Sequence, residues 1–208
     1  MKATTDVAVQ CRCGAVRGVA AVSPSTGNHA VCYCDDCQAF QHFLGREQDV
    51  LDSQGGTDIF QMSPVKLTLS AGAERLACIR LTPKGLLRWY TSCCNTPIGN
   101  TRGAGVPFIG LVCACLHGPA AALGPIRARA FPESAKGGAS AVPKDGAPLL
   151  LILARVLGFI VRWRLRGDHR RSPLFDSATG APRAVPRIVT AAQREDLRRR
   201  CASWRAAS

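Results

Sequence analysis

The chain has 208 residues, of which 47% are hydrophobic, and it carries a formal net charge of +13 at pH 7. The length suits one domain with an extension or two small domains, and the hydrophobic content is enough for a packed core. The 11 cysteines follow a polar start that contains no apolar export segment. These features argue against a secreted disulfide framework and favour metal ligands in a reducing cytoplasm.

The positive charge is concentrated in the C-terminal quarter of the chain. Residues 151–208 contain 13 arginines and 4 acidic residues, whereas residues 1–130 contain 12 basic and 8 acidic residues. Such asymmetry is compatible with contact to nucleic acid or to an acidic membrane surface. We favour the alternative of a solvated arginine-rich tail, because no aromatic interleaving or recognised nucleic-acid motif accompanies the charge.

A strand is predicted over residues 7–10, followed by a tight turn at Cys11-Arg12-Cys13-Gly14 and a second strand up to residue 20. Gly14 would supply a backbone conformation that other residues resist. A short strand at 29–31 leads into Cys32, and residues 36–44 are typical of a short helix capped by Asp35 or Asp36.

Further short strands are expected along the next part of the chain, over residues 57–62, 65–70, 76–81, 86–91 and 106–116. In the strand at 86–91, alternation predicts a buried Trp89 and an exposed Arg88. Frequent strands separated by Gly and Pro turns predict a mainly β protein with a small antiparallel β fold.

The C-terminal part has a different character. Residues 131–148 are small, Gly/Pro/Ser-rich and non-periodic, which indicates a linker between a β domain at 1–130 and a basic helix and arm at 149–208. Residues 149–165 are apolar but include three arginines, too many for a spanning helix. We expect an amphipathic helix docked on the core, with a membrane surface or self-association as alternatives. Residues 172–176 and 181–186 suggest an extended surface arm, and Thr190 is predicted to cap a last helix.

Seven of the cysteines fall into three clusters, each after a predicted strand: Cys11/Cys13, Cys32/Cys34/Cys37 and Cys93/Cys94. The C-x-C-x-x-C spacing places three thiols in one tight loop, and zinc is the first candidate, because thiolates suit it and tetrahedral geometry accepts three sulfurs plus one more group. The simplest partition pairs the first and last clusters in a closed structural site. The middle cluster is then an open three-thiolate site, or, if another ligand closes it, a second structural one. One or two zinc ions would be bound.

Other cysteines and histidines could also bind metal, but we expect most of them to be packing residues. Adjacent cysteine side chains diverge, so one of Cys93 and Cys94 can be a bystander. His29 and His42 flank the middle cluster; we expect both to be packed or solvated, with His42 as a reserve fourth ligand. The remaining thiols are interpreted as small buried hydrophobes or, for Cys201, as an incidental surface thiol: Cys78, Cys113, Cys115 and Cys201.

The order Cys11-x-Cys13-Gly14-Ala15-Val16-Arg17, Cys32-x-Cys34-x-x-Cys37 and a late cysteine before a turn resembles the glutathione-dependent formaldehyde-activating enzyme family, which includes centromere protein V type domains. The resemblance covers roughly residues 7–117. It implies a β-rich, Mss4-like fold, a structural zinc on Cys11, Cys13 and the late pair, and a catalytic zinc on Cys32, Cys34 and Cys37. It also implies addition of glutathione to formaldehyde, which is carbon–sulfur lyase chemistry in reverse.

The late cluster departs from the family pattern Cys-x-x-Cys-Gly. Thr91 stands at the first cysteine and Asn95 at the glycine, although Asn also accepts left-handed conformations. Cys93 is a candidate to replace the lost ligand.

The leading hypothesis is a zinc protein with lyase-like activity on a small thiol, such as glutathione, and its aldehyde adduct. The alternative is a non-catalytic, zinc-stabilised binding module whose basic arm contacts nucleic acid, membrane or protein.

Overall fold

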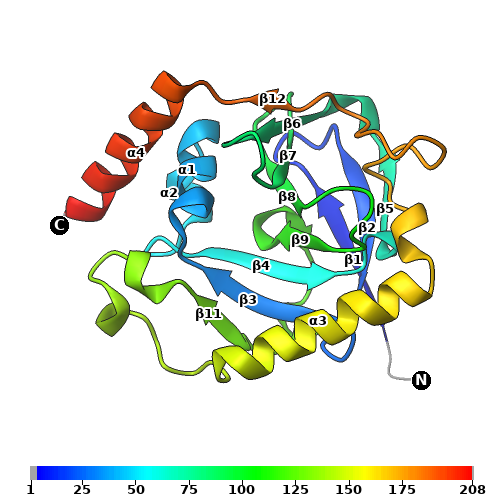
Figure 1. Cartoon of the computed structure of the whole chain (residues 1–208), viewed down its shortest axis with the longest axis horizontal. Coiled ribbons are helices and arrows are strands. Elements are labelled where there is room, and N and C mark those ends of the chain that lie inside the picture. The colour runs from blue at the N-terminus through cyan, green and yellow to red at the C-terminus, as the bar shows by residue number, and fades with distance from the viewer. Residues whose placement is uncertain (1–3, 208) are drawn as a thin grey trace.

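The computed structural model describes residues 4–207 and shows a mainly β protein with helices at its C-terminal end (Figure 1). The predicted mainly β fold is therefore confirmed. A four-stranded sheet has the strand order β10 (Leu116–His117), β1 (Thr5–Gln10), β2 (Arg17–Val22), β5 (Leu67–Ala71). An eight-stranded sheet has the order β11 (Ala128–Ala130), β3 (Asn28–Cys32), β4 (Thr57–Met62), β9 (Ile109–Val112), β8 (Pro97–Thr101), β7 (Leu87–Thr91), β6 (Leu76–Arg80), β12 (Arg187–Ile188).

Most neighbouring strands are antiparallel, and the parallel pairs lie at the two edges of the larger sheet, where β11 joins β3 and β12 joins β6. The α-helices are α1 (Asp35–Leu44), α2 (Glu47–Val50), α3 (Leu149–Leu165) and α4 (Ala191–Ala206). Short 3-10 helices span Pro64–Lys66, Ala73–Arg75, Cys113–Cys115, Ala120–Ala122, Pro132–Ser134, Ala139–Ala141 and Asp168–Arg170. Within residues 4–207, no helix combines the length and the apolar character that crossing a bilayer requires.

The main core lies between the two sheets. Alternate residues of β1, Val7 and Val9, point into it and meet Phe60, Trp89 and Leu111 of the larger sheet. Strands β8 and β9 are buried along their whole length. On the other side of the larger sheet, Figure 1 shows α3 running past β3 and β11, and α4 lying beside α1.

Several local expectations need correction. The predicted strand over 106–116 is interrupted, because the chain turns into a 3-10 helix after Val112. Cys34, not Asp35 or Asp36, occupies the N-cap position of α1. The surface arm expected over 172–176 is wrong for Leu174 and Phe175, which are buried in the main core.

The cap of the last helix and the predicted linker can also be compared with the structure. Thr190 caps α4 through a capping box with Gln193, as its position before the helix predicted.

The segment predicted as a linker packs Ala135 and Val142 against Val31 and Tyr33. The division at residues 130 and 148 stays a prediction.

Candidate metal centres

Four cysteine sulfurs meet where two turns from different sheets touch. Cys11 and Cys13 lie in the β1–β2 turn of the smaller sheet, and Cys93 and Cys94 in the β7–β8 turn of the larger one. Their Sγ atoms are 3.5 Å (Cys11–Cys13), 3.4 Å (Cys13–Cys93) and 3.9 Å (Cys11–Cys93 and Cys93–Cys94) apart. Zinc with four tetrahedral sulfurs at about 2.3 Å requires sulfur–sulfur separations of about 3.8 Å. This four-cysteine group therefore fits zinc.

The local backbone explains why both turns can present their sulfurs. Gly14 has a φ of 74°, and Asn95 has a φ of 53°, so both adopt the left-handed conformation that the sequence predicted. The amide of Gly14 donates to the carbonyl of Cys11 (2.8 Å), and the amide of Val16 donates to Cys11 Sγ (3.2 Å). Amide donors directed at a sulfur stabilise its thiolate.

Thr91 contributes a hydroxyl beside the four-cysteine group. Its Oγ1 lies 3.4 Å from Cys94 Sγ, and the hydroxyl of Thr96 lies 3.2 Å from the same sulfur. Burial raises the pKa of Cys94, but these hydroxyls and the Cys13 backbone lower it to about 5. Cys93 faces Cys11 and Cys13, so four sulfurs gather even though Thr91 is not a cysteine.

The middle cluster is built from a single short segment. Cys32 ends β3, Cys34 caps α1, and Cys37 lies in the first turn of that helix. Their Sγ atoms all lie within 4.8 Å of one another, and Cys32 and Cys34 are 3.4 Å apart. Over residues 4–207, this three-cysteine group gains no further Cys, His, Asp or Glu ligand within the same distance. His42, the reserve ligand in the sequence analysis, lies in the last turn of α1, 3.6 Å from Glu47.

A buried arginine lies beside this group, although strand alternation predicted that it would be exposed. Arg88 on β7 is 2% exposed, and its Nη1 lies 3.9 Å from Cys37 Sγ and 3.4 Å from Asn100 Oδ1. Its Nη2 donates to Asp36 Oδ2 (3.4 Å), and its guanidinium lies 5.6 Å from the Phe40 ring centre. A buried cation is costly unless an anion faces it. The half-exposed Asp36 offers one such anion, and a thiolate at Cys37 offers the other.

The three sulfurs differ in acidity. Hydrogen bonds from Cys32 and Cys34, together with the charge of Arg88, hold the pKa of Cys37 well below its ordinary value, although burial raises it. Hydrogen bonds with Cys34 and Cys37, and burial, raise the pKa of Cys32. The hydrogen bond with Cys32 lowers the pKa of Cys34, but the bond with Cys37 and burial raise it to about 12. One negative charge is thus stable in the group, and three thiolates require a bound cation.

A cavity of about 390 Å³ opens between α1, α4 and the turn after β6. Asp35 and Asp36, which directly follow Cys34, line it together with three arginines of α4 (Arg194, Arg198 and Arg205). Arg205 pairs with Asp35 at 2.6 Å. Cys201, expected on the surface, is buried and lines the same cavity, because α4 packs on α1.

A third group of possible ligands includes His29 and Cys113, which were predicted to be packing residues, and also Asp58. His29, Asp58 and Cys113 place one donor atom each within 4.8 Å of one another. Nδ1 of His29 lies 2.8 Å from the Gly124 carbonyl oxygen, and Nε2 lies 2.8 Å from Asp58 Oδ1. Burial lowers the pKa of His29, but the bonds to Asp58 and Gly124 outweigh it, and the pKa is raised. Both ring nitrogens are thus satisfied by oxygen acceptors, so we assign this group as an ion pair.

Comparison with known proteins places the chain in a family. No curated protein matches it. The crystal structure of a Rhodobacter sphaeroides protein is similar with 19% identity and a TM-score of 0.41, and the match covers 59% of this chain and 98% of that one. The model of the family of unknown function DUF6151 matches residues 3–185, which is most of the chain, and the protein therefore belongs to that family.

Proposed function

We propose that the protein binds two zinc ions, a structural one at the four-cysteine group and a reactive one at the three-cysteine group. At the second site it would act on a small thiol, such as glutathione, and its aldehyde adduct, which is carbon–sulfur lyase chemistry. The resemblance to the formaldehyde-activating family supports this reaction class. Eleven free cysteines support a reducing compartment, for which we propose the cytoplasm.

The observation that carries the proposal is the difference in ligand number between the two groups. Four sulfurs complete a tetrahedral shell, as in structural sites, whereas three leave a position for an exchangeable ligand, as in catalytic sites. The three-cysteine group also lies at the start of α1, where backbone amides favour negative charge. The geometry therefore suits one closed and one open site.

The residues of this site have separable tasks. Cys32, Cys34 and Cys37 would hold the metal, which would supply the means to lower the pKa of a substrate thiol. Arg88 offsets the negative charge of the thiolates from one side. The arginines around the neighbouring cavity offer partners for the carboxylates of an anionic thiol, as Arg–carboxylate pairing favours.

The bond changes of the proposed reaction balance without a redox partner. The substrate thiolate sulfur forms a bond to the aldehyde carbon, and the carbonyl electrons move to oxygen, which takes a proton from water. The reverse reaction breaks the carbon–sulfur bond and returns the thiol and the aldehyde.

A second candidate is the non-catalytic zinc-stabilised binding module. It is favoured by the burial of Cys32 and Cys37, which are 7% and 6% exposed. Such burial limits the room for a substrate next to the metal. In this case the second zinc would only fix the β3–α1 junction.

Zinc content and adduct formation together test the proposal. We expect two zinc ions per chain in the wild type and one in Cys34→Ser, with the circular dichroism spectrum retained. Cys113→Ala is the control and should keep both ions, because Cys113 belongs to neither group. Exchange of ¹³C-formaldehyde with a thiol, followed by NMR, should be accelerated by the wild type but not by Cys34→Ser.

The outcomes separate the two candidates. Loss of one zinc in Cys34→Ser, with no acceleration by the wild type, would support the binding module instead of the enzyme. A zinc content that Cys34→Ser leaves unchanged would refute a metal site at the three-cysteine group.

A further inference from the structure

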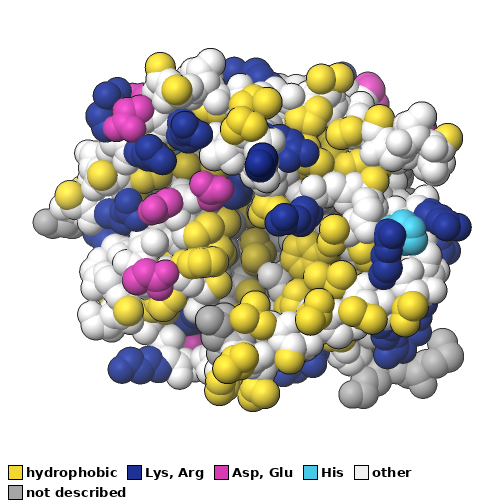
Figure 2. All heavy atoms as spheres, in the orientation of Figure 1, with side chains coloured by type: hydrophobic (Ala, Val, Ile, Leu, Met, Phe, Trp, Pro, Cys, Tyr) yellow, Lys and Arg dark blue, Asp and Glu magenta, His cyan; other side chains and the backbone are white. Residues whose placement is uncertain are grey.

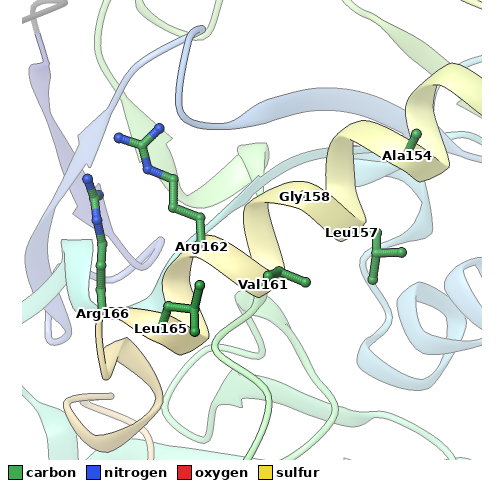
Figure 3. A pocket seen from close by; sticks show the side chains of 7 residues that line it. All are labelled: Ala154, Leu157, Gly158, Val161, Arg162, Leu165 and Arg166. Carbon is green, nitrogen blue, oxygen red and sulfur yellow. The ribbon is translucent and has the colours of Figure 1, made fainter.

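Helix α3 exposes an apolar row along one side. The row consists of residues three or four positions apart, so that they share one helix face: Leu150, Leu153, Leu157, Val161 and Leu165. Their exposed fractions are 80%, 56%, 62%, 50% and 84%. Figure 3 shows Leu157, Val161 and Leu165 along this side of α3, with Gly158 between Leu157 and Val161 and Ala154 one turn before Leu157. A helix face of this kind normally faces a partner.

The opposite face of α3 is fixed to the protein, so the row cannot turn inward. Ile152 and Trp163 are buried, and Phe159 stacks on Trp163 with ring centres 5.3 Å apart. Arg155 donates to the carbonyl oxygens of Pro24 (2.9 Å) and Gly27 (3.2 Å). The docked helix expected from the sequence is therefore present, and its outer face is also apolar.

The exposed charged residues within residues 149–171 are all positive. Residues 149–171 contain a single acidic residue, Asp168, and it is buried, where it accepts a hydrogen bond from Ser63 (2.7 Å). The exposed charges at the C-terminal end of the row are all arginines: Arg162, Arg164, Arg166, Arg170 and Arg171. Figure 2 shows apolar side chains along the lower edge, over α3, and Lys or Arg side chains toward its right-hand end. The surface thus pairs apolar area with positive charge.

We propose that α3 lies on the surface of a membrane that contains anionic lipids. The apolar row would enter the boundary between headgroups and acyl chains, while the arginines at its C-terminal end face lipid phosphates, a combination typical of interfacial helices. The inference is independent of the function proposed for the zinc sites.

The size of the row favours a lipid surface over a second copy of the chain. A helix of 17 residues is about 25 Å long and exposes a strip about 10 Å wide, or about 250 Å². A stable protein–protein interface buries about 800 Å² on each partner. A lipid surface requires no matching protein surface, so a single helix face is enough for reversible binding.

The test measures binding of the full-length, zinc-loaded protein to vesicles by co-sedimentation. We expect the wild type to bind vesicles of phosphatidylcholine with phosphatidylserine, to bind pure phosphatidylcholine more weakly, and to be released by salt. The variant Leu157→Glu/Val161→Glu should lose at least about tenfold in binding, because it places two charges in the apolar row. Replacing Arg162 and Arg166 by Gln should weaken binding to the anionic vesicles by about fivefold per arginine.

The control is Val185→Glu, which changes a 91% exposed apolar side chain outside α3 and should bind like the wild type. The circular dichroism spectrum and zinc content should be the same in all variants, because the changed side chains are exposed. Failure of the wild type to bind anionic vesicles would overturn the proposal, as would equal binding by Leu157→Glu/Val161→Glu. A dimer in gel filtration that this double variant abolishes would assign the row to a second copy instead.

Discussion

The two cysteine groups use similar sulfur–sulfur distances but are built in different ways. The four-cysteine group joins turns from two sheets, and the cysteines it pairs, such as Cys13 and Cys93, are 80 positions apart. The three-cysteine group lies within six consecutive residues at the β3–α1 junction. A metal in the first group would hold the sheets together, whereas a metal in the second would constrain only a local loop. Under the proposed function, the first metal would be needed for folding and the second would be available for chemistry.

The groups also differ in how negative charge is stabilised. The four-cysteine group relies on neutral donors, such as the Val16 amide and the hydroxyls of Thr91 and Thr96. The three-cysteine group has a full positive charge beside it, the buried guanidinium of Arg88. A charged neighbour acts over a longer range than a dipole, so metal affinity at the second group should depend on that one residue.

The largest expected effect is that of breaking the four-cysteine group. Cys11→Ala should remove one zinc and lower the free energy of unfolding by at least about 4 kcal/mol, because zinc binding to a structural site contributes directly to folding. For a chain of this length, that loss lowers Tm by at least about 8 °C. Zinc analysis and thermal unfolding followed by circular dichroism measure both quantities.

Cys115→Ala is the matched control, because it deletes a buried sulfur outside both groups; Cys11 is 1% exposed and Cys115 is 0% exposed. It should cost only the loss of packing, about 1 to 2 kcal/mol, and keep both zinc ions. Equal losses of stability in the two variants would mean that the four-cysteine group does not link the sheets through a metal.

A smaller effect is expected from Arg88→Met, which removes the charge beside the three-cysteine group but keeps a long side chain. Zinc affinity at this group should fall by about 10- to 100-fold, in the range found for residues that support metal ligands. Competition with a chelator should then remove one zinc from the variant at lower chelator concentration, while the other zinc is retained as in the wild type. The fold should be kept, because Met suits a buried position.

Arg75→Met is the control for this prediction, because Arg75 is an exposed arginine on the 3-10 helix Ala73–Arg75 and its side chain pairs with Glu74 at 3.6 Å. If the chelator removes zinc equally from Arg88→Met and Arg75→Met, Arg88 serves packing and not the metal site.

The sequence could predict the cysteine groups but not the buried arginine beside the three-cysteine group. Cysteine spacing and the turn residues Gly14 and Asn95 are local features, and local features are readable from one sequence. Arg88 was expected in solvent because neighbouring residues of a strand normally face opposite sides. Strand β7 is buried on both sides, by the main core at Trp89 and by α1 at Arg88, so the alternation does not separate inside from outside.

The same reasoning explains the other residues whose burial the sequence did not predict. Leu174, Phe175 and Cys201 are buried by contacts with elements far away in the sequence, the main core for the first two and α1 for the third. Leu174 and Phe175 form a short apolar pair between Ser172 and Asp176 with no strand or helix period, and Cys201 directly follows three arginines of α4. Helix α3 shows the converse, because its period predicted one docked face but not that the outer face would also be apolar.

The smallest expected effect concerns the His29–Asp58–Cys113 group. It contains the residue types that bind metals but only one sulfur, so it tests whether the number of sulfurs decides where a metal binds. The pKa of His29 is raised above its ordinary value of 6.5, so the ion pair with Asp58 stabilises the fold below pH 6.5, and this contribution is lost as the pH rises through the raised pKa. Asp58→Asn should therefore destabilise the protein by about 1 kcal/mol at about pH 5.5 and by less at about pH 8.5, since the carboxylate is half-exposed.

Urea unfolding across this pH range measures the difference. Asp6→Asn, which changes an exposed aspartate on β1, is the control and should keep the wild-type slope of stability against pH, because the His29–Asp58 pair is intact. A slope that persists in Asp58→Asn would mean that another group titrates. Added zinc should leave the wild-type curve unchanged, because both nitrogens of His29 already have oxygen partners. A zinc-dependent gain in stability that Asp58→Asn removes would instead make this group a third metal site. Proximity of residues that can bind metal would then be enough to form a metal site, and the number of sulfurs would no longer distinguish the sites of this protein.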